Sequence, residues 1–214
     1  MQAADCIIIP RWLIPVEPAG QGLEEHAVVL SNGRIVALVP AAEAVGSFAA
    51  EKVIERPDHV LIPGLINAHT HAAMTLFRGL ADDLPLQEWL EDHVWPLEAR
   101  WVDSNFVRDG TDLAVLEMIR SGTTCFNDMY YFPDTVAQVA AERNLRACVG
   151  MIVIEMKTAW ANNFEEYLTK GIKVHDRYRE HPLISTAFAP HSTYAVGDKA
   201  LQRILTLADQ LDVP

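Results

Sequence analysis

The stretch Val60–His71 constrains the fold more than any other part of the chain. It begins as a near-continuous run of Val, Leu and Ile and ends in two histidines separated by one residue. Such a run is typical of a parallel strand covered on both faces, and alternation along a strand predicts that His69 and His71 project from the same face. The polar sequence after Ala72 places the pair at the strand's carboxyl end, where α/β folds carry their chemistry. We interpret the pair as half of a metal site, against the alternative of two core or surface histidines.

From Val60 onward, strand patterns alternate with helix patterns, as in βαβ units. Asp103 is expected to cap the helix that runs to Arg120, with a buried stripe of Ala114, Leu116, Met118 and Ile119. The predicted strands are 60–68, 123–129, 145–154 and 183–189. The predicted helices are 85–101, 104–120, 133–143, 164–178 and 198–211.

The first 58 residues have a different, all-β texture. Asn32-Gly33 lies between two apolar runs, 26–30 and 35–39, and predicts a hairpin. A strand with an edge-type proline is expected over 5–16, a short helix over 41–50, and a strand over 52–55 that ends before Arg56-Pro57-Asp58. We therefore expect one small β domain, residues 1–58, and an α/β domain, residues 59–214.

Composition excludes several classes of function. The net charge of −12 and the pI near 5.0 argue against nucleic-acid or anionic-membrane binding, because these need clustered Lys and Arg. Cys6, Cys125 and Cys148 have no framework spacing and are expected to be reduced thiols. No secretory signal pattern and no membrane-length apolar run is present, so a cytoplasmic protein is expected.

Several ordered motifs carry a family resemblance. They are Pro63-Gly64-Leu65-Ile66-Asn67-Ala68-His69-Thr70-His71, Met74-Thr75-Leu76-Phe77-Arg78-Gly79, Trp95-Pro96-Leu97-Glu98, Ser121-Gly122-Thr123-Thr124 and Ala189-Pro190-His191-Ser192. With them the chain resembles the amidohydrolase superfamily, within it the methylthioadenosine/S-adenosylhomocysteine deaminase group and its s-triazine hydrolase relatives. The resemblance implies an α/β fold, a (β/α)8 TIM-type barrel with a small N-terminal β-sandwich.

Only strands one to four of that barrel are predicted here. A complete barrel typically needs about 250 residues, more than the residues from 60 to 214 supply. A half barrel would leave two open sheet edges. We therefore expect that the sequence is a fragment or that a second chain supplies the rest.

The resemblance also implies a metal-dependent hydrolase. His69 and His71 would bind Zn²⁺, with Fe²⁺ or Mn²⁺ as alternatives for such imidazole ligands. The remaining His and Asp ligands and the proton-shuttle Glu are expected beyond Pro214, so the catalytic residues are unknown in this chain. Ala189-Pro190-His191 stands where members with two metals carry a bridging Lys, which favours one metal.

Glu98 and His191 are the predicted substrate-binding residues. The resemblance implies that Glu98 accepts the two ribose hydroxyls and that His191 hydrogen-bonds the purine. From pattern alone, Glu98 is an ordinary helix carboxylate and His191 a turn cap, although the tryptophans near Glu98 are unusual for a solvated face. Asp128 is expected to hold loop geometry and not to react.

The predicted reaction is hydrolytic deamination of a 6-aminopurine nucleoside to the 6-oxo purine and ammonia. Group members that accept the amino-acid tail of S-adenosylhomocysteine carry an Arg after strand three, whereas 155–166 contains Lys157 but no Arg. We therefore favour 5′-methylthioadenosine over S-adenosylhomocysteine or adenosine. A triazine or other aminoheterocycle hydrolase and a non-catalytic assembly protein remain alternatives. A nucleoside substrate and a homo-oligomer are the expected partners.

Overall fold

The computed structural model describes all residues from Met1 to Pro214 and divides into two compact units, Met1–Pro63 and Gly64–Pro214. No helix in either one is long and apolar enough to cross a membrane. The assignment of 1–58 to a β-sandwich and of 59–214 to half a barrel stays a prediction about the domains.

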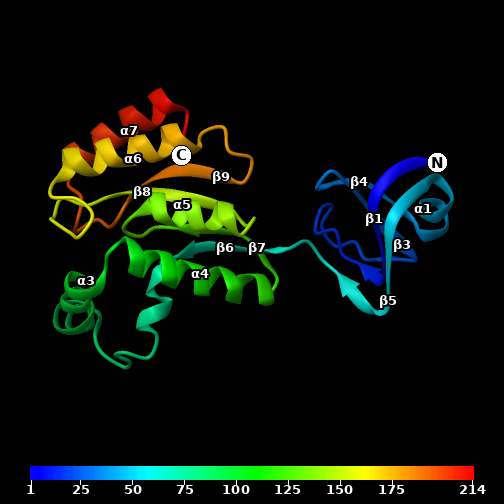
Figure 1. Ribbon diagram of the computed structural model, residues 1–214, viewed down its shortest axis with the longest axis horizontal. Helices are drawn as coiled ribbons and strands as arrows, with labels where there is room; N and C mark the ends of the chain where they lie inside the picture. Colours follow the sequence, from blue (N-terminus) through cyan, green and yellow to red (C-terminus); the bar gives the residue numbers. More distant parts are fainter. The chain divides into compact units, whose positions relative to one another are not determined.

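The first unit holds one mixed five-stranded sheet and helix α1 (Figure 1). Its elements are β1 (Gln2–Leu13), β2 (Leu23–Glu24), β3 (His26–Ser31), β4 (Arg34–Pro40), α1 (Ala41–Ser47) and β5 (Phe48–Leu61). The predicted hairpin is present, with Asn32 and Gly33 both at positive φ between β3 and β4. The edge assignment of the first strand was wrong, because β1 pairs with β3 and with β5. Pro10 is tolerated because it lies beyond the β3 ladder and beside a bulge.

Strand β5 corrects two predicted boundaries. It continues through Arg56-Pro57-Asp58 to Leu61, so Val60 and Leu61 belong to this strand and not to the first barrel strand. In the pairing with β1, Arg56 lies opposite Pro10 and Val60 lies opposite Trp12, with a register shift between these two pairs. Pro57 lies within this irregular segment, where it does not need to donate a backbone hydrogen bond to β1. The break instead comes at 62–64, before β6 (Leu65–Thr70).

The second unit is a parallel sheet of four strands in the order β6, β7 (Thr123–Asp128), β8 (Arg146–Val153) and β9 (Ile184–Pro190). Figure 1 shows the helices that connect these strands packed along the sheet. They are α4 (Ser104–Arg120), α5 (Pro133–Glu142), α6 (Phe164–Tyr178) and α7 (Asp198–Leu211). The predicted cap is present, since the Asp103 carboxylate accepts the Phe106 N–H at 2.8 Å.

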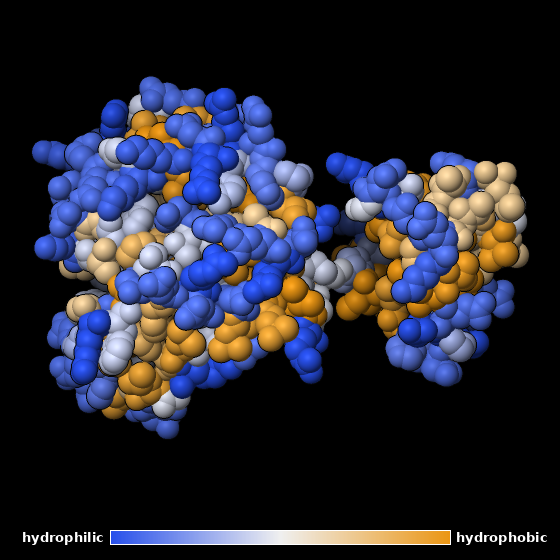
Figure 2. Space-filling model, in the orientation of Figure 1, coloured by the Kyte–Doolittle hydropathy of each residue, from blue (hydrophilic) through white to orange (hydrophobic).

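The buried face of α4 differs from the predicted stripe. Ala114 and Met118 are buried, whereas Leu116 and Ile119 are about half exposed, and Val107, Gly110 and Val115 pack inward instead. The prediction failed because α4 carries apolar residues on two faces. Figure 2 shows the resulting hydrophobic area over α4.

The polar connection after β6 forms two helical segments. Helix η1 (Ala72–Phe77) is a 3-10 helix that packs against α4. The predicted helix 85–101 is continuous but changes type, from α2 (Leu86–Glu88) through the π-helix η2 (Trp89–Val94) to α3 (Trp95–Trp101). π-turns of this kind are rare and occur often at functional sites.

Candidate active site

The carboxyl ends of the four parallel strands bring the predicted site residues together. His69 is the penultimate residue of β6, His71 directly follows this strand, and His191 directly follows β9. Glu98 comes from α3. His71, Glu98 and His191 line one cavity of about 200 Å³, so residues 120 positions apart in the chain share one space.

The three histidines form a cluster. The ring centroids of His69 and His71 are 5.1 Å apart and edge-on, and those of His71 and His191 are 6.4 Å apart and nearly parallel. The Nδ1 atom of His191 is buried and makes no hydrogen bond within the chain. Burial lowers the pKa of His191, and the charge of His69 lowers it further.

A backbone contact orients the His71 ring. Its Nδ1 is hydrogen-bonded to the carbonyl oxygen of Met129, which can only accept, so Nδ1 carries the proton and Nε2 keeps a free lone pair. Burial lowers the pKa of His71 and the hydrogen bond to Met129 opposes this, while His69 and His191 add to the lowering. The pKa is lowered overall, which favours a neutral imidazole with Nε2 available at neutral pH.

Three hydrogen bonds join the end of β7 to the residues around His71. Besides the Met129 carbonyl, the Met129 N–H donates to Thr70 at 3.0 Å, and the Asp128 carboxylate accepts the Ala72 N–H at 2.6 Å. Asp128 is fully buried, its Oδ2 has no partner, and burial raises the pKa of this carboxyl to about 7. Asp128 thus holds the chain next to His71, in line with the structural role expected for it.

Glu98 is buried, in contrast to an ordinary helix carboxylate. Tyr130 donates a hydrogen bond of 2.8 Å to its Oε1, and the Tyr131 hydroxyl lies 3.5 Å from its Oε2. Burial raises the pKa of Glu98, and the two phenols oppose the rise. Oε2 therefore keeps acceptor capacity for a ligand.

The π-helix brings apolar side chains to the same cavity. Trp89, Leu90 and Val94 of η2 line it, followed by Trp95 and Glu98 of α3. A second cavity of about 520 Å³ also borders Glu98 and is lined by Trp95, Met156, Lys157 and Ala159, among others. The carboxylate therefore stands between two adjoining spaces.

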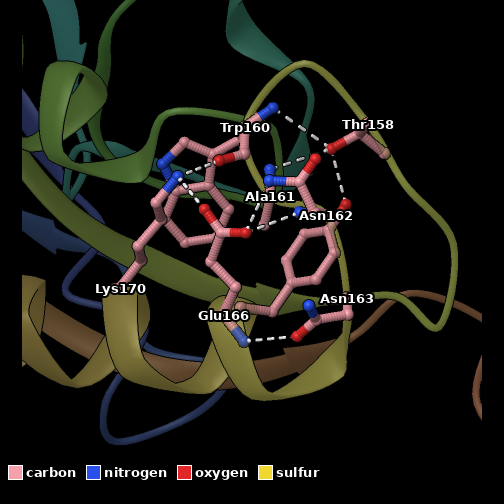
Figure 3. A network of polar contacts seen from close by, with 8 residues as sticks. Thr158, Trp160, Ala161, Asn162, Asn163, Glu166 and Lys170 are labelled. Carbon is pink, nitrogen blue, oxygen red and sulfur yellow. Dashed lines mark hydrogen bonds and ion pairs between the residues drawn. The ribbon is translucent and has the colours of Figure 1, made fainter.

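A polar network holds the loop that forms the second cavity (Figure 3). Lys170 of α6 pairs with Glu166 at 2.7 Å, donates to the Trp160 carbonyl and lies 5.8 Å from the centroid of the Trp160 ring. Thr158 shares a hydrogen bond of 2.5 Å with the hydroxyl of Tyr167. The loop between β8 and α6 is thereby fixed to the helix that follows it.

Tyr130 and Tyr131 were not predicted from the sequence. The signal that could have found them is their place directly after β7, on the edge where strand ends gather. Their contact with Glu98 depends on how α3 packs, which no local pattern reveals.

His69 and His71 fit a divalent metal as a partial donor set. Their rings are adjacent, and His71 has the Nδ1 partner that metal-bound histidines usually have. Within the chain, no group of three His, Cys, Asp or Glu side chains is placed to hold an ion. Two imidazoles are fewer than the roughly three protein ligands that a catalytic zinc takes.

The sequence profile of the amidohydrolase family matches residues 60–214. The chain belongs to the amidohydrolase family. A 5-methylthioadenosine/S-adenosylhomocysteine deaminase from Saccharophagus degradans is 48% identical to it. The aligned region covers 99% of this chain and 47% of that deaminase. The predicted resemblance to that group of the amidohydrolases is thus confirmed.

Two solved structures are similar to this amidohydrolase chain. An adenosine deaminase from Xanthomonas campestris with bound zinc is 50% identical, with a TM-score of 0.97 over the whole chain and 48% of that protein. Atrazine chlorohydrolase from Arthrobacter aurescens, complexed with zinc, is 16% identical, with a TM-score of 0.86 over 97% of the chain and 51% of that protein, and shows the fold alone. The chain spans about half the length of the relatives that it matches.

Proposed function

We propose that the complete protein containing this chain deaminates 6-aminopurine nucleosides hydrolytically, with 5′-methylthioadenosine as the preferred substrate. The observation that carries the proposal is the single cavity lined by His71, Glu98 and His191. It combines a potential metal ligand, a buried carboxylate and an unpartnered imidazole on the carboxyl edge of the sheet. The names of the similar deaminases support the same reaction class.

Different side chains would bind different parts of the substrate. Glu98 would accept hydrogen bonds from the ribose hydroxyls, which a carboxylate binds more strongly than a neutral acceptor does. His191 has a free Nδ1 that would bind a ring nitrogen of the purine, as donor or acceptor according to its tautomer. Trp89, Leu90 and Trp95 would exclude water from the base.

His69 and His71 would hold a zinc ion together with ligands expected beyond Pro214. When bound, such an ion lowers the pKa of a water molecule toward 7 and so makes hydroxide available at neutral pH. The Met129 carbonyl would keep Nε2 of His71 directed to the ion. The proton-shuttle Glu stays a prediction outside this chain.

The second cavity supports the preference for a short apolar 5′ substituent. Trp95, Met156 and Ala159 give it a largely apolar wall beside Glu98, and Lys157 is the cation that lines it. An ammonium group matches a carboxylate less well than a bidentate guanidinium does. A methylthio group therefore fits this space better than the amino-acid tail of S-adenosylhomocysteine.

The test is ammonia release by the complete zinc-loaded protein. We expect the highest kcat/KM for 5′-methylthioadenosine and lower values for adenosine and S-adenosylhomocysteine, with metal content measured by mass spectrometry to identify zinc, iron or manganese. Turnover of a chlorinated triazine without turnover of any nucleoside would reject the proposal. Absence of both metal and turnover would favour an assembly protein, and light scattering on the same preparation tests the expected homo-oligomer.

A further inference from the structure

Tyr130 lies between the histidine cluster and Glu98 in the candidate site. It follows β7, is 4% exposed, and lines the same cavity as His71, Glu98 and His191. Its ring lies 5.9 Å from that of His71, and its hydroxyl donates to Oε1 of Glu98 at 2.8 Å. One buried side chain therefore contacts the carboxylate from the side of the histidine cluster.

The hydrogen bond leaves the two carboxylate oxygens unequal. Oε1 is engaged by Tyr130 at a normal hydrogen-bond length, while Oε2 has only the Tyr131 hydroxyl at 3.5 Å, the outer limit for such a contact. No cation pairs with Glu98 within the chain, so the two phenols are its protein donors. Tyr130 is therefore the group that sets the rotation of the carboxylate and presents its remaining lone pairs to a ligand.

We propose that Tyr130 is a positioning residue for recognition of a vicinal diol, acting through Glu98. A cis-diol offers two hydroxyl donors at adjacent carbons, and a carboxylate binds both only when its plane is held toward them. This inference rests on the proposed function and adds a second residue to the selection of ribosides over deoxyribosides. Packing supports it, because Tyr130 and Tyr131 contact each other at 4.9 Å between centroids and restrict the motion of both rings.

The test compares Tyr130→Phe with the unaltered complete protein on 5′-methylthioadenosine and its 2′,3′-dideoxy analogue. Loss of a hydrogen bond to a charged group predicts a fall in kcat/KM for the riboside of about tenfold or more, mainly through KM. The value for the dideoxy analogue should stay nearly unchanged, because it lacks the hydroxyls that Glu98 binds. Tyr178→Phe is the matched control: Tyr178 is a buried tyrosine of α6 outside the cavity, and its variant should leave both substrates unaffected.

The ratio of kcat/KM for the riboside to kcat/KM for the dideoxy analogue is measured on one preparation. A loss of active protein through partial unfolding lowers both values equally and does not change this ratio. If Tyr130→Phe does not fold, 3-fluorotyrosine at position 130 keeps the hydroxyl and changes its donor strength; the ratio should then shift, and an unchanged ratio would overturn the role. An equal loss on both substrates, or no loss, also overturns it while leaving the deaminase function intact. Absence of nucleoside turnover by the unaltered protein would instead overturn the proposed function and this role with it.

Discussion

The backbone N–H of Ala72 donates a hydrogen bond of 2.6 Å to the buried carboxylate of Asp128, one residue beyond His71. The bond joins the start of η1 to the end of β7 and fixes the backbone next to the predicted metal ligand. Asp128 therefore acts on the site without facing a ligand itself.

Asp128→Ala is expected to weaken zinc binding by the complete protein about 10-fold to 100-fold, the usual effect of removing a residue that supports a metal ligand. Competition with a chelator measures the affinity, and the absorption spectrum of the cobalt-substituted protein reports ligand geometry. Asp128→Asn, which keeps an oxygen acceptor, should lie closer to the unaltered protein. Asp112→Ala, at an exposed ion pair with Arg143, is the control. Unchanged affinity and spectrum in Asp128→Ala would contradict the role.

Ionisation of Glu98 should cost stability. Burial raises its pKa above the ordinary value of 4.5, so the folded chain keeps the proton to a higher pH than the unfolded chain does. The protonated Glu98 side chain makes its full contribution to the free energy of unfolding below pH 4.5. This contribution is lost as the pH rises through the raised pKa. The Tm of Glu98→Gln relative to the unaltered metal-free protein should therefore increase from pH 4 to 8, by about 2 °C.

Glu166 supplies a control of opposite sign. Lys170 and Asn162 hold its pKa at about 2, so its ionised form stabilises the fold, and this contribution is lost only as the pH falls below 4.5 toward 2. Glu166→Gln should thus lose Tm relative to the unaltered protein as the pH rises from 2 to 5. Parallel pH profiles for the two variants would refute the assignment of opposite shifts.

Gly110 allows α4 to pack closely on η1. A Cβ atom at this position would lie 2.4 Å from the carbonyl oxygen of Ala73. We expect Gly110→Ala to lower the free energy of unfolding by about 2 kcal/mol through overpacking, and to weaken metal binding because η1 follows His71. Gly46→Ala, a helical glycine with open space around it, should be neutral or stabilising by about 0.5 kcal/mol. Denaturant unfolding measures both, and equal effects would contradict the packing argument.

Lys170 should influence substrate affinity through the loop it holds. Lys170→Ala removes the ion pair with Glu166 and the contacts with the carbonyl and ring of Trp160. We expect faster proteolysis within 155–163 and a higher KM for 5′-methylthioadenosine at unchanged kcat. Lys173→Ala in the same helix is the control, since Lys173 is exposed and makes none of these contacts. A fall in kcat alone would point to a different role.

The sequence predicted those parts of the fold that depend on local signals. The bounds of α6 and α7, the Asp103 cap and the Asn32-Gly33 turn follow from short patterns, and all are present. The path of β5 through Pro57 and the exposure of Leu116 depend instead on partners distant in the chain. The assignments of His69, His71, Glu98 and His191 stay predictions, now supported by their proximity.

The helix type of η2 has a consequence for chain length. A π-turn holds more residues than an α-turn, so the number of residues between Trp89 and Val94 sets the direction in which Glu98 leaves α3. The same residues wound as an ordinary α-helix would turn everything downstream further by about 100°, because the π-turn accommodates one residue more than α geometry does. The direction of the Glu98 carboxylate therefore depends on the number of residues in η2 as well as on their identity.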